Sequence, residues 1–296
     1  MLWFKCDEML GGVSLAVLCL ALILGGYFFS RDLTPCENAS DFCRWCINYL
    51  TGQILSMAER SDDNIENFKQ QNNMAFIVGY TGETGSALVK QLARDKIFKK
   101  VFLIGRRKVE LPPEVGPEFE QKQVDFDDLD RDADIFKGID VGFCCLGTTR
   151  GKSGAAGFVK VDFDYVLKSA ELAKAGGCKQ FHVLSSQGAD KDSMMLYTKT
   201  KGQMEEALKV IHFPRLSIYR PAVLMVNREE TRPLEAMTRF LLIPIAKMFP
   251  TAITTPMDVL VKAMVNNVVS PSGKTVELLD NKAIHYMSGI SVKCKK

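Results

Sequence analysis

The chain has 296 residues, a length that fits one large α/β domain with an additional terminal segment. It is 47% hydrophobic and 25% charged, and its formal net charge of +3 excludes the strong basicity typical of nucleic-acid-binding proteins. The nine cysteines are irregularly spaced and odd in number, which favours free thiols in a reducing compartment over a disulfide framework. The low net charge predicts no nucleic-acid partner.

The N-terminal region carries a membrane-spanning pattern, because residues 9–30 contain no charged side chain. As a helix this segment would span roughly 33 Å, against about 30 Å for a hydrocarbon core. We expect residues 1–30 to form an uncleaved hydrophobic anchor, with a cleaved signal peptide as the alternative. Basic residues after the segment slightly favour a folded domain facing the cytosol, and a chain lacking the segment would be a soluble cytoplasmic or nuclear form.

Residues 31–73 are expected to be a polar linker, whose last part, 61–73, reads as a linker or a surface helix. Residues 74–296 form the expected folded domain. Its short apolar runs predict strands at 74–78, 101–104, 141–146, 181–184 and 216–219. Helical spacing or length predicts helices at 86–93, 158–175, 234–249 and 257–269, with a late strand at 275–279.

Buried strands that alternate with helices predict an α/β fold with a doubly wound parallel sheet. The looser pattern after Pro221 predicts a small C-terminal lobe on the substrate side. Because ligands of such sheets bind at the carboxyl ends of the strands, functional residues should directly follow the apolar runs.

A glycine turn, Gly79-Tyr80-Thr81-Gly82-Glu83-Thr84-Gly85, follows the first expected strand and opens a helix. Glycines there permit a tight turn and a close approach to a pyrophosphate, and the N–H groups and dipole of the helix N-terminus favour an anion. A generic glycine turn is the plain alternative. The order of strand, turn and helix favours nucleotide binding.

Two arginines, Arg106 and Arg107, follow the second expected strand, where an NAD site usually carries an acidic residue. Their charge and forked donors suit a 2′-phosphate, so we expect NADPH as the cofactor. A solvated basic loop is the alternative. Asp125, after a possible third strand, is placed beside the adenine.

Tyr197 and Lys201 form a Y-x-x-x-K pair, which a helix places on one face. A nearby ammonium favours the phenolate, which suits an acid or base for carbonyl reduction or alcohol oxidation. Ser185 and Ser186 end a strand upstream, and either hydroxyl is a candidate to orient the reacting oxygen. A solvated helix face is the alternative for the pair.

These motifs, with the stretch from Asp140 to Cys178 and the segment LSSQGADK, resemble the atypical short-chain dehydrogenase/reductase superfamily, and within it the HIV Tat-interactive protein oxidoreductases. The resemblance covers about residues 66–285 and implies a Rossmann-like fold. It places Thr81, Gly82, Glu83 and Thr84 at the pyrophosphate and Arg106 and Arg107 at the 2′-phosphate. It further implies contacts from Leu146, Gly147, Tyr197, Lys201, Leu224 and Arg232.

Such relatives are associated with apoptosis, transcription and trafficking, so two hypotheses follow from the resemblance. The first is an NADPH-dependent oxidoreductase acting on an unknown carbonyl or alcohol. The second is an NADPH-sensing regulatory protein with protein partners and little turnover. A third, phosphoryl transfer at residues 147–153, is disfavoured because this loop is one residue shorter than a Walker motif. Three scattered histidines predict no metal site.

Overall fold

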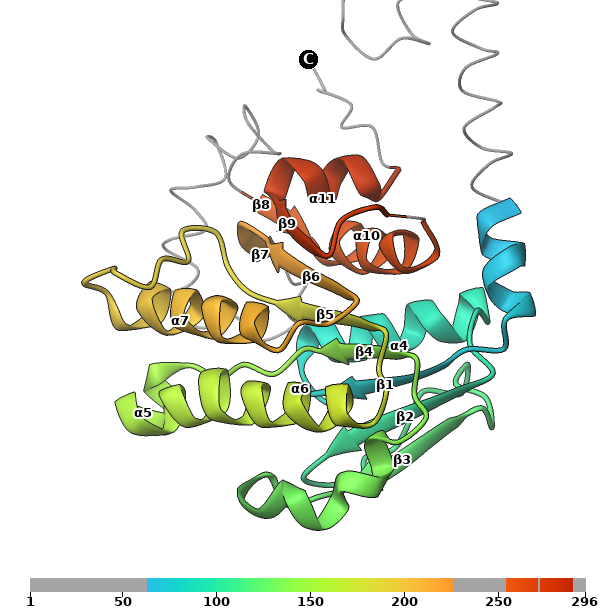
Figure 1. Cartoon of the computed structure of the whole chain (residues 1–296), viewed down its shortest axis with the longest axis horizontal. Coiled ribbons are helices and arrows are strands. Elements are labelled where there is room, and N and C mark those ends of the chain that lie inside the picture. The colour runs from blue at the N-terminus through green and yellow to red at the C-terminus, as the bar shows by residue number, and fades with distance from the viewer. Residues whose placement is uncertain (1–62, 226–253, 271, 290–296) are drawn as a thin grey trace, which may run out of the picture. The chain divides into compact units, whose positions relative to one another are not determined.

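The computed structural model describes residues 63–225, 254–270 and 272–289, which form one compact unit. A seven-stranded parallel sheet lies at its centre, in the order β3-β2-β1-β4-β5-β6-β9 (Figure 1). The strands are β1 (Met74–Val78), β2 (Lys100–Gly105), β3 (Phe119–Gln123), β4 (Val141–Cys144), β5 (Gln180–Leu184), β6 (Arg215–Arg220) and β9 (Val276–Asp280). The doubly wound parallel sheet expected from the sequence is thereby confirmed.

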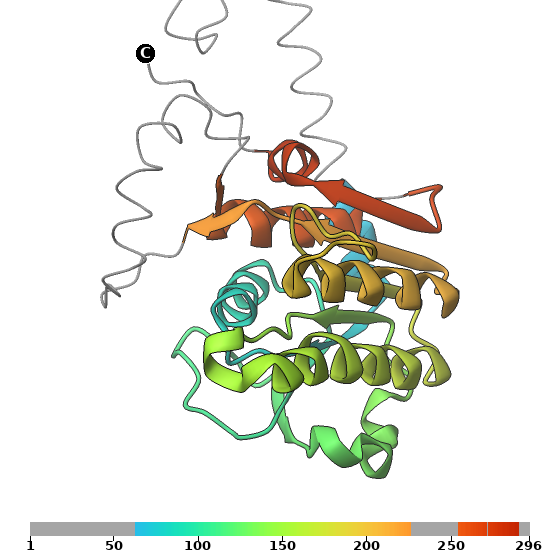
Figure 2. The same ribbon diagram turned by 90° about the vertical axis from the view of Figure 1, so that its left-hand side faces the viewer.

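Helices cover both faces of this sheet (Figures 1 and 2). Besides the helical residues 63–70, the α-helices of the described residues are α4 (Glu83–Asp95), α5 (Arg150–Val159), α6 (Tyr165–Ala175), α7 (Leu196–Val210), α10 (Met257–Val269) and α11 (Asn281–Met287). A 3₁₀ segment, η1 (Phe126–Phe136), lies between β3 and β4, and a single π-helical turn, η2 (Lys160–Asp164), joins α5 to α6. A parallel pair, β7 (Val223–Met225) with β8 (Thr254–Pro256), makes a second small sheet.

The alternation of side chains along β1 divides the core in two. Ala75 and Ile77 pack with apolar residues of α4 and α10, whereas Phe76 and Val78 pack with those of α6 and α7. Both faces of the strand are buried, as expected for a central parallel strand that reads as a continuous apolar run.

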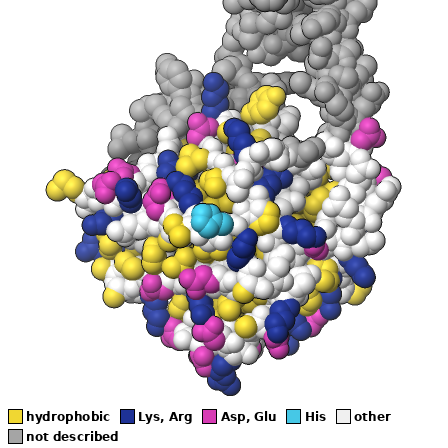
Figure 3. Space-filling view, in the orientation of Figure 1, with side chains coloured by type: hydrophobic (Ala, Val, Ile, Leu, Met, Phe, Trp, Pro, Cys, Tyr) yellow, Lys and Arg dark blue, Asp and Glu magenta, His cyan; other side chains and the backbone are white. Residues whose placement is uncertain are grey.

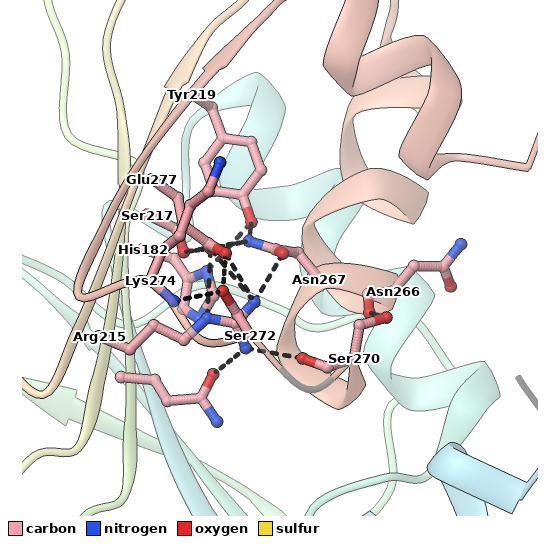
Figure 4. Close-up of polar contacts among 11 residues, drawn as sticks. His182, Arg215, Ser217, Tyr219, Asn266, Asn267, Ser270, Ser272, Lys274 and Glu277 are labelled. Carbon is pink, nitrogen blue, oxygen red and sulfur yellow. Dashed lines mark hydrogen bonds and ion pairs between the residues drawn. The ribbon is translucent and has the colours of Figure 1, made fainter.

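The C-terminal part differs from the separate lobe expected after Pro221. Strand β9 pairs with β6, and α10 packs on the same face of the sheet as α4. A polar network ties these elements together, in which Asn267 Nδ2 donates to Tyr219 Oη (2.9 Å) and Ser217 Oγ donates to Glu277 (2.9 Å; Figure 4). Arg215 adds a bond to Asn267 Oδ1 (2.8 Å). These residues therefore complete the main α/β layers.

Two regions differ in detail from the sequence-based expectation. Residues 63–70 are helical, and Phe68 packs edge-on against Phe98 with 5.5 Å between ring centroids, so the compact unit begins before residue 74. Residues 158–175 are helical throughout, as expected, but they include a π turn, η2, between α5 and α6. The π turn is what separates α5 from α6.

Residues 9–30 and the helix expected at 234–249 lie outside the described residues. Within the described ranges, no helix is long and apolar enough to cross a membrane. On the face shown in Figure 3, Lys and Arg side chains are interspersed with Asp and Glu, in keeping with a net charge of only +3.

Candidate active site

A cleft of about 620 Å³ opens at the carboxyl ends of β1, β4, β5 and β6. Its walls come from the four segments that leave those strands, at 82–84, 145–148, 184–188 and 221–224, together with side chains from η2 and α7. The cleft brings together ten of the residues singled out in the sequence: Gly82, Glu83, Thr84, Leu146, Gly147, Ser185, Ser186, Tyr197, Lys201 and Leu224. Arg232 lies outside the described residues.

The glycine turn shapes one end of this cleft. Gly79 has φ of +81°, and a Cβ there would lie 2.8 Å from the backbone of Cys145, so this position requires glycine for both conformation and space. A Cβ on Gly85 would overlap the carbonyl of Gly79. Helix α4 begins at Glu83, earlier than the expected residue 86, and its N-cap Gly82 offers no side chain to cap the first turn. The turn therefore fits a pyrophosphate at the helix N-terminus.

The two arginines after β2 line different cavities. Arg106 shares a cavity with Asp125, and Arg107 shares another with Thr81 and Ser86. The backbone between them is anchored, because Tyr80 Oη donates to the carbonyl oxygen of Arg107 (2.8 Å). The structure thus separates two side chains that the sequence had grouped together.

Asp125 has a structural task in addition to its expected place beside the adenine. Its carboxylate accepts the backbone N–H of Asp127 (2.9 Å) and caps η1. Its cavity also contains Asp128 and Arg131.

The two serines after β5 have different partners. Ser185 Oγ donates to Glu205 Oε1 (2.5 Å), and this buried carboxylate also accepts two bonds from Arg220. Ser186 is 8% exposed, and its hydroxyl has no hydrogen-bond partner among the described residues. A buried polar atom without a partner at the wall of a cleft is suited to bind a ligand oxygen.

Tyr197 and Lys201 lie on α7 with their side chains at the cleft, as the i, i+4 spacing predicted. Tyr197 is 48% exposed, and its ring lies 5.7 Å from that of the buried Phe158. Lys201 is buried and forms an ion pair with Asp162 (2.8 Å), and its Nζ also reaches the carbonyl oxygen of Leu184 (3.4 Å). Within the described residues, no hydrogen bond joins the tyrosine hydroxyl to the lysine.

Asp162 is a charged residue of the cleft lining that sequence reasoning missed. It is 1% exposed, and its second carboxylate oxygen accepts the backbone N–H of Thr148 (2.8 Å). The available signal was an acidic residue between Val161 and Phe163 in a segment expected to be buried helix. The bond at Thr148 also occupies an N–H that a Walker-type loop would offer to phosphate, which argues further against phosphoryl transfer.

Fold and cleft together define a Rossmann-type protein that binds a nicotinamide dinucleotide. A family model described as NAD(P)H-binding matches residues 79–236. The chain belongs to this family, within the atypical branch of the short-chain dehydrogenase/reductase superfamily, as its resemblance predicted.

Its relatives agree with this assignment. It is 50% identical to the protein HTATIP2 of Rattus norvegicus over 222 residues, covering 75% of this chain and 92% of that protein. It is 33% identical over 159 residues to FMP52 of Debaryomyces hansenii, which is named mitochondrial, covering 53% and 70%. A UDP-glucuronic acid 4-epimerase from Bacillus cereus in complex with NAD shares the fold at a TM-score of 0.55, 16% identity and coverage of 70% and 77%.

Proposed function

We propose that the protein is an NADPH-dependent oxidoreductase that transfers hydride between the cofactor and a carbonyl or alcohol. The observation that carries this proposal is the shared cleft, which joins the glycine turn at Gly82 to the side chains of Ser186, Tyr197 and Lys201. A cofactor bound by its pyrophosphate at α4 would extend toward those three side chains.

The cofactor contacts follow from the same geometry. The first turn of α4 is assigned to the pyrophosphate, and Leu146, Gly147 and Leu224 to the walls around the ribose and nicotinamide. The arginine pair favours NADPH over NADH, and of the two Arg107 is assigned to the 2′-phosphate, because a guanidinium group binds a phosphate by charge and by forked donors. When bound, NADPH supplies the hydride.

The chain's own residues handle the substrate oxygen and its proton. The unpartnered hydroxyl of Ser186 orients the oxygen of the carbonyl. Tyr197, whose hydroxyl has no hydrogen-bond partner among the described residues, exchanges a proton with that oxygen. Lys201 binds the ribose beside the nicotinamide. Ser186, and not Ser185, therefore holds the substrate.

A titration with NADPH and NADH, followed by a screen of aldehydes, ketones and alcohols, tests the proposal. We expect NADPH to bind more tightly, and turnover to vanish in Tyr197→Phe while NADPH affinity persists. Tyr286→Phe is the control, because Tyr286 is 80% exposed and lies on α11, away from the cleft lining. Tight binding of NADPH without turnover of any compound would favour the regulatory alternative.

The proposal includes a location. The uncharged residues 9–30 support a membrane anchor, and the basic residues after them favour a catalytic domain in the cytosol. Carbonate extraction of membranes containing the full chain should leave the protein in the pellet. Release into the supernatant would contradict the anchor.

A further inference from the structure

The ion pair between Asp162 and Lys201 is buried at the wall of the cofactor cleft. The side chains are 1% and 5% exposed, and the charged atoms lie 2.8 Å apart. The second carboxylate oxygen accepts the N–H of Thr148, which also lines the cleft. One carboxylate therefore contacts both the helix that carries Tyr197 and the loop that follows β4.

The π turn η2 carries Asp162 and is itself held from outside. Lys160 Nζ forms an ion pair with Asp127 (2.7 Å), and Tyr165 Oη donates to the same carboxylate (2.5 Å). Single π turns inside helices occur often at functional sites, because the additional residue changes the direction of the side chains around it. Here the turn presents Asp162 to the cleft, while its first residue, Lys160, and the residue after it, Tyr165, bind Asp127.

We propose that Asp162 is a positioning residue of the cofactor site, which holds Lys201 and the Thr148 loop where the nicotinamide ribose binds. The proposal rests on the proposed function, since it names a residue serving that same site. It also implies that the charge of Lys201 is compensated, so the anionic cofactor is held chiefly by α4 and the arginines. Removing one partner of a buried ion pair leaves an uncompensated charge, whereas removing both does not.

A double-mutant cycle on NADPH binding tests this coupling, with affinity measured by fluorescence titration of the full chain. We expect Asp162→Asn to weaken NADPH binding by roughly tenfold or more, a coupling within the range for residues in direct contact. The same substitution should cause no further loss in a Lys201→Met background. Additive losses would show that Asp162 does not act through Lys201 and would overturn the proposal. Glu206→Gln, which breaks an exposed ion pair with Lys209 on the same helix, is the matched control.

A second measurement tests, in the absence of cofactor, whether the amine of Lys201 is accessible to a reagent. Amine acetylation followed by mass spectrometry should find Lys201 protected in the parent protein and modified faster in Asp162→Asn. Unchanged protection would overturn the proposal.

If the parent protein fails to bind NADPH, the proposed function fails, and the acetylation result still decides whether Asp162 holds Lys201. If Asp162→Asn does not fold, the double variant Asp162→Asn with Lys201→Met, which leaves no unpaired buried charge, takes its place. Its affinity for NADPH is compared with that of Lys201→Met alone. Equal affinity supports the coupling, and a further loss in the double variant overturns it.

Discussion

Ser185 donates a hydrogen bond to Glu205 across 2.5 Å, linking the end of β5 to helix α7. Glu205 is fully buried and pairs with Arg220 at the end of β6. One carboxylate thus joins α7 to the ends of β5 and β6, the two strands from which cleft-lining segments leave. The next residue, Ser186, keeps a hydroxyl without a partner in the described part of the chain. The two neighbouring serines therefore differ in their hydrogen-bond partners, although their side chains are the same.

The serines should respond differently to removal of the hydroxyl. Ser186→Ala should lower kcat about 100-fold, comparable to loss of one donor to a reacting oxygen, with NADPH affinity unchanged. Ser185→Ala should instead lower the free energy of unfolding by about 1–3 kcal/mol, because Glu205 loses a buried donor. Steady-state kinetics and urea denaturation measure the two effects. A Ser185→Ala variant with normal stability and a larger kcat defect than Ser186→Ala would contradict the assignment.

Substitution of the two arginines should also have different effects on the affinity for NADPH and NADH. The cavity of Arg106 contains three carboxylates, from Asp125, Asp128 and Asp132, which repel a phosphate, whereas that of Arg107 offers the hydroxyls of Thr81 and Ser86.

We therefore expect Arg107→Ala to weaken NADPH by roughly 10- to 100-fold, as for loss of a charged hydrogen bond, and NADH little. Arg106→Ala should reduce affinity for both cofactors to a similar extent, and the double variant should lose NADPH far more than NADH. Isothermal titration with each cofactor measures these ratios. A selective loss of NADPH in Arg106→Ala alone would reverse the assignment.

His182 should make stability depend on pH. Burial lowers the pKa of His182 from 6.5 to about 3. Between these values the unfolded chain binds a proton that the folded chain does not, so stability should fall as pH decreases from 6.5 toward 3. The slope attributable to one proton is at most about 1.4 kcal/mol per pH unit.

Urea denaturation between pH 5 and 7 should show a flatter pH dependence in His182→Gln than in the parent chain. His212→Asn is the control, since His212 is exposed and asparagine tolerates its φ of +57°. Identical slopes in the parent chain and His182→Gln would show that His182 takes up no excess proton on unfolding.

Gly79 provides a test of the cofactor turn. Gly79→Ala should destabilise the fold by more than the roughly 1–3 kcal/mol of a strained φ, because its Cβ would also overlap the backbone of Cys145. Gly138→Ala is the matched control, with φ of +70° and no neighbouring atom within 4 Å. We expect loss of NADPH binding only for Gly79→Ala, measured by titration beside thermal melts. Equal destabilisation by both substitutions would contradict the claim that a Cβ at position 79 overlaps the backbone of Cys145.

The sequence predicted strands β1, β2, β4, β5 and β6 well because they are short apolar runs, whereas β3, with the polar sequence FEQKQ, was expected only as a possible strand without bounds. Even the bounds of α10, residues 257–269, were predicted correctly. The π turn η2 within the helix at 158–175 was not predicted, since such a turn depends on the tertiary contacts of Lys160, Asp162 and Tyr165 and not on local periodicity.

The sequence predicted only those site residues that belong to a recognisable motif. The spacing of Tyr197 and Lys201 placed both on one helix face, but it could not show that Asp162, 39 positions upstream of Lys201, pairs with the ammonium. Likewise, two adjacent serines look alike until the partner of each hydroxyl is known. In both cases the partner lies far away in the sequence, so only the folded structure shows it.

The central claim, an NADPH site built on the glycine turn and the arginines, is tested most directly by a titration of the full chain with NADPH and NADH under identical salt and pH. The account predicts saturable binding of one NADPH per chain, tighter than NADH by roughly tenfold or more from the 2′-phosphate contacts. Equal affinity for the two cofactors, or binding of neither, would contradict it.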